Sequence, residues 1–219
     1  MGKEINLLEK YPKTKRQVQQ RALTRTEEDV LIARQFGREF FDGERRHGYG
    51  GFQYHPRFWH PVVPDFISYF SLTQNSSVLD VGCSKGFMLH DIAMFVPGIC
   101  TAGIDISSYA IEHAMDSQKA NLLVGNATNL PYPDKSFDVV LSINTVHNLE
   151  RCECIQALKE IQRVSKKHAY VVVDAYQTDA EKEAIFAWAL TAKTILHVQE
   201  WKELFLEAGY DGDYYWFTP

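Results

Sequence analysis

The stretch VLDVGCSKG, residues 78–86, decides the fold class of this chain. An apolar run ends in Asp80 and continues into a loop with glycine at positions 82 and 86, and a helical pattern follows. In doubly wound sheets, ligands bind at the carboxyl ends of the strands, beside such loops. Glycine is favoured there because a Cβ would keep the backbone away from a ligand. The spacing G-x-x-x-G differs from the G-x-G-x-x-G of dinucleotide loops, which disfavours a nicotinamide-dependent oxidoreductase.

After residue 77, short apolar runs alternate with helical patterns. The predicted strands are 77–81, 100–104, 122–124, 138–143, 169–174 and 214–217, and the predicted helices are 87–95, 108–116, 155–164 and 198–208. Apolar strands that alternate with helices are typical of a parallel sheet covered on both faces. We therefore expect an α/β fold with a doubly wound, mostly parallel sheet. A stripe of apolar side chains is expected to cover this sheet: Phe186, Trp188, Leu190 and Ile195.

The first part of the chain has a different character. We expect residues 1–70 to form a helical and loop extension of a domain formed by residues 71–219. Thr26-Glu27-Glu28-Asp29 predicts the capped start of a helix. Ile32, Phe36 and Phe40 recur along it at helical spacing, and Gly43 is the expected end.

Residues 47–60 are rich in glycine and aromatic side chains. They predict either a packed loop with aromatic anchors or a lid that closes over a ligand. The candidate substrate contacts in this segment are Tyr49, Tyr54, Trp59 and His60.

The net charge of −5 is unevenly distributed. Residues 1–60 hold twelve Lys and Arg against eight Asp and Glu, whereas residues 61–219 hold eleven against twenty. The basic residues before position 26 indicate either a solvated, partly disordered tail, which we favour, or an arm that holds an anionic substrate. They are Lys3, Lys10, Lys13, Lys15, Arg16, Arg21 and Arg25. Because the domain itself is acidic, nucleic acid is a disfavoured partner.

Two further segments extend the pattern around Asp80. TAGIDI at residues 101–106 is a second apolar run that ends in an acid, Asp105, 25 positions after Asp80. Such a carboxylate can accept hydrogen bonds from both ribose hydroxyls of a nucleoside. The third segment is VGNATNLP at residues 124–131, followed by SFDVV at residues 136–140.

Together, over roughly residues 75–175, these segments resemble class I S-adenosylmethionine-dependent methyltransferases, in particular the small-molecule type 11 group. That family reads D-V-G-C-G-x-G in the first segment and G-D-A-x-x-L-P-F, then F-D-x-V, in the third. The resemblance implies a Rossmann-like methyltransferase fold that binds S-adenosyl-L-methionine. It assigns Gly82, Cys83 and Gly86, with Asp80 beside them, to the methionine part. It assigns the remaining contacts to Asp105 (ribose), Ile106, Asn126 and Ala127 (adenine) and Asn144 (beneath the cofactor).

The chain departs from the family pattern at three places. Ser84 and Lys85 replace the usual small pair, and the Lys85 side chain is expected to point to solvent. Asn126 replaces an aspartate, and its amide can accept a hydrogen bond from the adenine amino group. The family adds a seventh, antiparallel strand after the sixth. Without it, the N-terminal segment or a partner chain, as in a homodimer, would have to cover the sheet edge.

Methyl transfer from a sulfonium is an in-line displacement, so alignment of donor and acceptor is the main requirement. His147, after the fourth predicted strand, is a candidate base, because an unperturbed imidazole titrates near ~6.5. Its alternative role is packing or capping. Asp174 and Tyr176 end the fifth strand and are candidate acceptor contacts.

The expected function is methyl transfer to a small polar acceptor, for example a sugar derivative or a phosphorylated metabolite. The alternatives are an RNA methyltransferase and a non-catalytic binding module of the same fold. The four cysteines lack a metal-ligand or disulfide spacing, so we expect no metal site. No apolar run approaches ~20 residues, and residues 1–10 lack a signal-peptide pattern. We therefore expect a cytoplasmic protein that binds no membrane.

Overall fold

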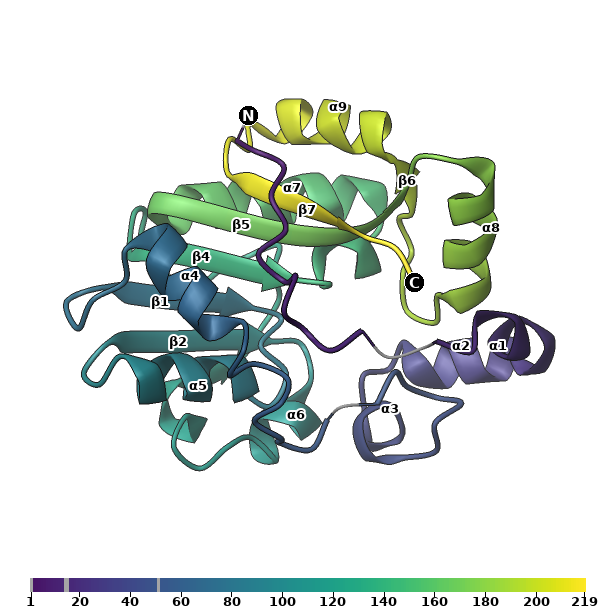
Figure 1. The fold of residues 1–219 in the computed structure, drawn as a ribbon, viewed down its shortest axis with the longest axis horizontal. Helices are drawn as coiled ribbons and strands as arrows, with labels where there is room; N and C mark the ends of the chain where they lie inside the picture. Colours follow the sequence, from purple (N-terminus) through teal and green to yellow (C-terminus); the bar gives the residue numbers. More distant parts are fainter. Residues whose placement is uncertain (1, 14–15, 51) are drawn as a thin grey trace.

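The computed structural model describes residues 2–13, 16–50 and 52–219, and within them the chain forms one parallel sheet of seven strands. The order is β3-β2-β1-β4-β5-β6, with β7 also paired to β5 (Figure 1). The strands are β1 (Ser77–Val81), β2 (Cys100–Asp105), β3 (Leu122–Val124), β4 (Phe137–Ile143), β5 (Ser165–Tyr176), β6 (Leu196–His197) and β7 (Asp213–Phe217). This order reverses between β1 and β4, so the predicted doubly wound fold is confirmed.

Helices cover both faces of the sheet. On one face, α4 (Val63–Phe70) and α5 (Phe87–Phe95) pack against Val78, Val139 and other strand residues. On the other face, α7 (Arg151–Val164) and α9 (Val198–Ala208) bury Leu158, Trp201 and Phe205 against the strands. Successive strand residues point to opposite faces, and both faces are covered, so the middle parts of the central strands are buried and mostly apolar, as in Ala169–Val173 of β5.

The edge of β7 is covered by the N-terminal segment. The Ile5 amide donates to the Tyr214 carbonyl at 2.9 Å, and the Tyr214 amide donates to the Lys3 carbonyl at 3.0 Å. The Tyr170 hydroxyl also donates to the Ile5 carbonyl at 3.0 Å. The sequence left this cover open between the N-terminal segment and a partner chain, and the structure assigns it to the N-terminal segment. The extra strand relative to the prediction is β6, whose two residues are too few to carry a periodic pattern.

The middle of the N-terminal extension lies at the carboxyl ends of the strands, together with α6 (Ser108–Glu112) and α8 (Asp179–Trp188) (Figure 1). This part holds the helices α1 (Val18–Thr24), α2 (Glu27–Ala33) and α3 (Arg38–Asp42), whereas α4 at the end of the extension packs on a face of the sheet. The predicted capping box is present, since Thr26 and Asp29 exchange side-chain hydrogen bonds with each other's amides. The single helix predicted from Thr26 to Gly43 is wrong, because Phe36 adopts a φ of 49° and separates α2 from α3.

The basic arm is also not the solvated tail that we favoured. Leu7 is buried, Lys10 pairs with Asp65 at 2.7 Å, and Arg25 donates to the carbonyl of Phe186 at 3.0 Å. Lys15, which was predicted as part of the basic arm, lies outside the described residues. The stripe expected to cover the sheet is corrected too: Phe186 is 48% exposed, and Trp188 faces a cavity beyond the end of the sheet.

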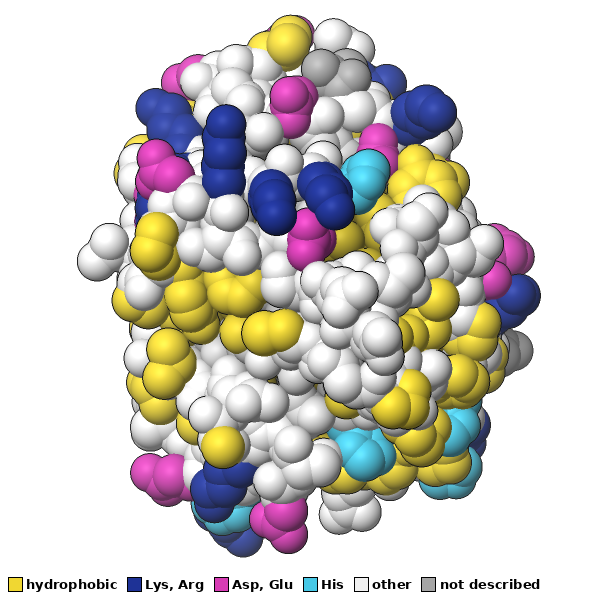
Figure 2. Space-filling view, turned by 90° about the vertical axis from the view of Figure 1, so that its left-hand side faces the viewer, with side chains coloured by type: hydrophobic (Ala, Val, Ile, Leu, Met, Phe, Trp, Pro, Cys, Tyr) yellow, Lys and Arg dark blue, Asp and Glu magenta, His cyan; other side chains and the backbone are white. Residues whose placement is uncertain are grey.

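The opposite end of the sheet, where the strands begin, is the face seen in Figure 2. Lys and Arg side chains gather in its upper part. Lys135, Lys166 and Lys167 line a shallow depression at this end, and Lys167 pairs with Asp138 at 2.9 Å. In the described part of the chain, no helix combines the length and the apolar character needed to cross a bilayer.

Candidate active site at the carboxyl ends of the strands

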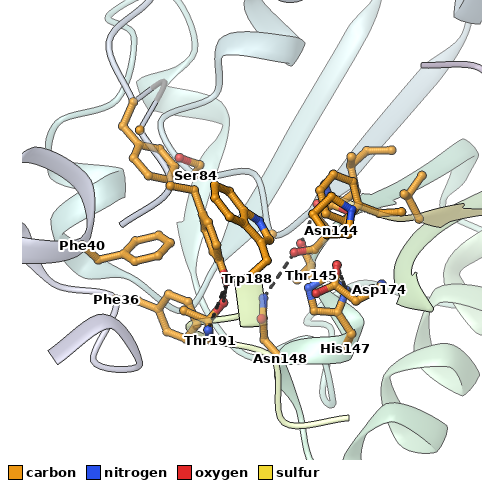
Figure 3. Close-up of a pocket in the computed structure, with 18 of the residues that line it drawn as sticks. Phe36, Phe40, Ser84, Asn144, Thr145, His147, Asn148, Asp174, Trp188 and Thr191 are labelled. Atoms are coloured by element: carbon orange, nitrogen blue, oxygen red, sulfur yellow. Dashed lines mark hydrogen bonds and ion pairs between the residues drawn. The ribbon is translucent and has the colours of Figure 1, made fainter. Parts of the chain in front are cut away.

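A cavity of about 1380 Å³ lies between the carboxyl ends of β1, β2, β4 and β5 and the N-terminal extension. Its lining includes eight of the nine predicted cofactor residues: Asp80, Gly82, Cys83, Asp105, Ile106, Asn126, Ala127 and Asn144. It also includes aromatic and polar side chains from the extension and from the segment after α8 (Figure 3). A cavity of this size can hold a nucleoside cofactor and a small second ligand, because ligand pockets typically measure about 300–1,000 Å³.

The glycine loop is shaped by Gly82. Gly82 has a φ of 88°. A Cβ built on Gly82 would overlap the side chain of Thr145, including the Cβ of Thr145. The Gly82 amide donates to the Ile104 carbonyl at 2.7 Å, which ties the loop to β2. Any larger residue would therefore displace the loop that a ligand must approach.

Gly86 is placed differently from the prediction. It does not line the cavity but stands at the N-terminal end of α5, with a φ of 75°. A Cβ at this position would lie 2.9 Å from Leu122 Cδ1. The structure thus places Gly86 where α5 packs closely against β3, outside the lining of the cavity.

Ser84 and Lys85 have separate environments. Ser84 has a φ of 51°, which a glycine would adopt more readily. Its amide donates to Asp105 Oδ2 at 2.7 Å, and its buried Oγ has no hydrogen-bond partner among the described residues. Lys85 does not point to solvent as expected. It is buried, and its Nζ lies 2.7 Å from Asp42 Oδ2, so it ties α3 to the glycine loop.

Two carboxyl groups make this end of the cavity acidic. Asp105 accepts hydrogen bonds from the amides of Ser84 and Ser107, which leaves lone pairs for a further donor. Burial raises the pKa of Asp80 to about 8, and the charge of Asp105 adds to the rise. A positively charged ligand would favour the ionised form of Asp80, since an opposite charge lowers the pKa of a carboxyl.

The predicted adenine contacts are partly revised. Ile106 is 56% exposed at the cavity, so its side chain is free to pack on a flat ring. The side-chain oxygen of Asn126, Oδ1, accepts from both the main-chain amide and the hydroxyl of Thr128, at 2.9 and 3.0 Å. That oxygen was expected to accept from the adenine amino group, but both of its lone pairs are engaged. The amide nitrogen of Asn126 remains as a donor, which suits a ring nitrogen instead.

His147 is buried beneath the cavity, next to Asp174 (Figure 3). Its Nδ1 accepts a hydrogen bond from the Asp174 amide at 2.8 Å, so the proton of the neutral ring sits on Nε2. Burial lowers the pKa of His147 to about 3. A ring with one nitrogen already accepting and the other protonated has no free lone pair at neutral pH. The geometry therefore argues against the predicted role of His147 as a base.

Asp174, unlike His147, is suited to accept a proton at neutral pH. It lies at the end of β5, lines the cavity, and is only 4% exposed. Burial raises the pKa of Asp174 to about 7, against which the charge of Arg16 acts. Tyr176, the other candidate on this strand, does not line the cavity and packs edge-on against His197 with ring centroids 5.6 Å apart.

The aromatic segment is a packed loop that contributes to the wall of the cavity. Tyr49 lines the cavity, and its hydroxyl accepts from the Leu190 amide at 2.7 Å, while Trp59 lines it as well. Tyr54 and His60 do not line the cavity. The Tyr54 hydroxyl instead donates to Asp91 at 2.7 Å on α5, and His60 Nε2 lies 3.4 Å from the same carboxylate.

Several lining residues were not predicted as site residues. They come from the extension, from the end of α8 and from the segment after it: Phe36, Phe40, Arg45, Trp188 and Thr191, with Asn148 after β4. All of them except Arg45 are labelled in Figure 3. The basic composition before position 26 and the aromatic segment 47–60 were the signals that pointed to this wall. Among the described residues, no group of three His, Cys, Asp or Glu side chains has an arrangement that could hold a metal ion.

Known proteins share this fold and parts of this sequence. Residues 79–173 match the family model described as methyltransferase domain. A protein of Encephalitozoon cuniculi named as a methyltransferase is 32% identical over 123 residues, which are 56% of this chain and 50% of that protein. The tRNA (carboxymethyluridine(34)-5-O)-methyltransferase of Arabidopsis thaliana is 31% identical over 144 residues, 64% of this chain and 33% of that one. The chain thus spans half or less of the length of these two curated relatives.

Two solved structures illustrate the fold. One chain of the Haloferax volcanii complex between the Trm112 methyltransferase activator and a methyltransferase matches with a TM-score of 0.54, at 24% identity over 65% of this chain and 64% of that chain. The cyclase SpnF matches with a TM-score of 0.55, at 22% identity over 72% and 60% of the two chains. At these identities, the likeness defines the fold and not the reaction.

The fold and the cavity define a doubly wound domain with its ligand site at the switch point of the sheet. The family match adds the class: residues 79–173 match a methyltransferase domain, of the class I family that uses S-adenosylmethionine as methyl donor. The resemblance stated from the sequence is confirmed at this level.

Proposed function

We propose that this protein transfers the methyl group of S-adenosylmethionine to a small polar acceptor by in-line displacement, with a sugar derivative or a phosphorylated metabolite as the acceptor. The observation that carries the proposal is the cavity, which joins the glycine loop of the family to a separate wall of aromatic and basic side chains. Buried polar atoms without partners, Ser84 Oγ and Asn148 Oδ1, belong to residues of the same cavity. Buried polar atoms are normally paired, so these are groups that a ligand would satisfy.

The residues at the strand ends fit the cofactor. Gly82 and Cys83 would lie along its methionine part, and Asp105 would accept from the ribose hydroxyls. The charge of Asp105 contributes to the raised pKa of Asp80, so the two carboxyls lie close together and make an environment that favours a cation. When bound, the cofactor supplies an electrophilic methyl group on a positively charged sulfur. Residues 71–219 would form the cofactor-binding domain, and residues 1–70 the acceptor wall.

Asp174 is the residue we assign to accept the acceptor's proton. A carboxyl with a pKa of about 7 is partly ionised at neutral pH and is well matched to this task. His147 would act as a positioning residue, because its Nδ1 holds the Asp174 amide and lies 3.5 Å from Asp174 Oδ1. The proton would pass from an acceptor hydroxyl or ammonium to a carboxylate oxygen of Asp174.

One relative supports an alternative acceptor. The Arabidopsis thaliana protein is named as a tRNA methyltransferase, so methylation of an RNA is the second candidate function. Against it stands the net charge of −9 on residues 61–219, which would repel a phosphate backbone. Salt-dependent retention of RNA by the full chain, lost on removal of residues 1–25, would favour RNA over a small molecule.

The test of the proposed function is formation of S-adenosylhomocysteine in the presence of sugar phosphates, free sugars or tRNA. We expect turnover with one of the small-molecule classes, a loss of at least about 100-fold in Asp105→Ala, and no change in Asp116→Ala, an exposed aspartate away from the cavity. Turnover with tRNA and with none of the small molecules would mean that the acceptor is an RNA and not a small polar molecule. Cofactor binding without turnover on any acceptor would favour the non-catalytic module.

A further inference from the structure

Three guanidinium groups surround one tryptophan ring on the acceptor side of the cavity. The Cζ atoms of Arg21, Arg16 and Arg45 lie 4.3, 5.8 and 5.9 Å from the centroid of Trp188. The three come from different places: the segment before α1, α1 itself and the loop after α3. Tertiary packing therefore gathers three cations at one point, a cluster that no single stretch of sequence contains.

These three arginines differ from several other basic residues of the extension, which have a carboxylate partner. Arg46 pairs with Asp29 at 2.6 Å, Lys10 with Asp65 at 2.7 Å, and Lys13 with Glu9 at 2.7 Å. For the arginines around Trp188, by contrast, no carboxylate of the described residues lies within ion-pair distance. The charge of Asp174 acts on Arg16 from beyond that distance, so the cluster gathers three positive charges without a direct ion-pair partner.

The hydrogen-bonding groups of the cluster are also incompletely used. Arg21 Nη2 donates to the Gly48 carbonyl at 3.0 Å, whereas Arg21 Nη1 is buried and has no partner among the described residues. Arg45 donates to the same carbonyl. Arg16 lies 4.7 Å from the ring centroid of Phe217. Burial lowers the pKa of all three, and for Arg21, where the charge of Arg45 adds to the effect, to about 10. A buried donor without a partner, such as Arg21 Nη1, is unfavourable next to two like charges, and an anion between the three guanidinium groups would relieve that cost.

We propose that Arg16, Arg21 and Arg45 form a binding site for an anionic oxygen-bearing group of the methyl acceptor, a phosphate or a carboxylate, against the ring of Trp188. The inference rests on the proposed function for the identity of the ligand as the acceptor. All four residues line the same cavity as the cofactor loop. Figure 3 shows Trp188 and Thr191 in the same cavity as Asn144, Thr145 and His147, so an anion held at this ring shares the cavity with the ends of β4 and β5.

The site would select and orient the acceptor. Guanidinium groups bind phosphate and carboxylate oxygens through paired N–H donors, which fixes direction as well as position. With its anionic group held at Trp188, an acceptor would extend its reacting atom toward Asp174. Binding energy from this remote group would then serve alignment with the cofactor.

The test is calorimetric titration of the full chain with inorganic phosphate, pyrophosphate and malonate, with and without S-adenosylhomocysteine. We expect millimolar or tighter binding of at least one anion. We also expect about a 10-fold weaker affinity in Arg21→Gln and a smaller loss in Arg16→Gln, with no change in Arg38→Gln. Arg38 is the matched control, exposed and paired with Glu39 at 2.9 Å. Arg21→Lys should recover only part of the loss, because lysine keeps the positive charge but lacks the paired N–H donors of the guanidinium group.

The outcomes separate cleanly. Preference for phosphate or pyrophosphate over malonate identifies a phosphorylated acceptor, and the reverse identifies a carboxylate. Equal affinities in Arg16→Gln, Arg21→Gln and Arg38→Gln, or no binding of any of the three anions to the wild type, would overturn the site. Arg16→Gln carries the test if Arg21→Gln is unstable, because no hydrogen bond of Arg16 to another described residue is present to be lost. Anion binding by a chain that fails to bind S-adenosylhomocysteine would leave this site standing while the proposed function fails.

Discussion

The two halves of the cavity are built in different ways. The half at the strand ends, around Gly82 and Asp105, is made by short segments that lie next to one another because parallel strands end together. The other half, around Trp188, is assembled from the N-terminal extension, the end of α8 and the segment after α8, and the extension lies far from the other two along the chain. The first half is held by backbone geometry, and the second by side-chain contacts. The comparison indicates why one fold can keep a single cofactor while its acceptors vary.

The largest effect is expected at the cofactor half, from Gly82→Ala. The new methyl group would overlap Thr145, and the φ of 88° is unfavourable for alanine. We expect loss of cofactor binding and a decrease of ~2 kcal/mol or more in the free energy of unfolding. Gly37→Ala is the control, because a Cβ there meets no atom within 4 Å and the φ is −91°. Calorimetric binding and denaturant titration measure both changes, and near-normal cofactor affinity in Gly82→Ala would contradict the assigned loop.

At the junction of the two halves, Asp174→Asn should lower turnover by about 10²–10⁴-fold. The asparagine preserves shape but cannot accept the proton, so the affinity for S-adenosylmethionine should stay the same. The wild-type rate should rise as the pH increases through about 7, because the carboxyl must be ionised to act as a base. Steady-state rates from pH 5.5 to 9 measure this. A variant with wild-type turnover would remove Asp174 from the mechanism.

The smallest predicted effect concerns protons exchanged on cofactor binding. At pH 7 the Asp80 carboxyl of the free protein is mostly protonated, because its pKa is about 8. A cationic cofactor lowers that pKa, so binding should release up to about one proton more in the wild type than in Asp80→Asn. Calorimetry in two buffers with different ionisation enthalpies gives the number directly. Equal proton release in the two proteins would mean that Asp80 does not sense the ligand.

Much of the cofactor half could be predicted from the sequence. Apolar strands such as 77–81 carry their own pattern, and Asp80 and Asp105 follow from the positions where two strands end. Gly86 was expected beside the ligand, but it lies outside the cavity lining because its left-handed conformation begins α5. The spacing of the glycines does not reveal this. The protonation state of His147 could not be predicted from the sequence either, since it depends on burial and on the hydrogen bond from the Asp174 amide.

The acceptor half could be predicted only in outline. The basic composition before residue 26 left an anion-binding arm as the alternative to a solvated tail, because composition does not show which cations are already paired with acids. Trp188 appeared as one member of an apolar stripe, because its position against Arg21 is a tertiary contact. The left-handed turn at Phe36 interrupts an otherwise regular helical pattern, and the regular spacing of Ile32, Phe36 and Phe40 hid the break that Gly37, the N-cap of α3, marks.

The most direct measurement is calorimetric titration of S-adenosylmethionine into the wild type and Asp105→Ala, with the melting temperature of each protein recorded. Removal of a carboxylate that accepts from the ribose should weaken binding by at least about 10-fold, since a hydrogen bond to a charged group contributes about 1.5–3 kcal/mol. Micromolar binding to the wild type that weakens in a folded Asp105→Ala is the predicted result. Absence of binding to the wild type, or equal binding to both proteins, would contradict the cofactor site described at the ends of β1 and β2.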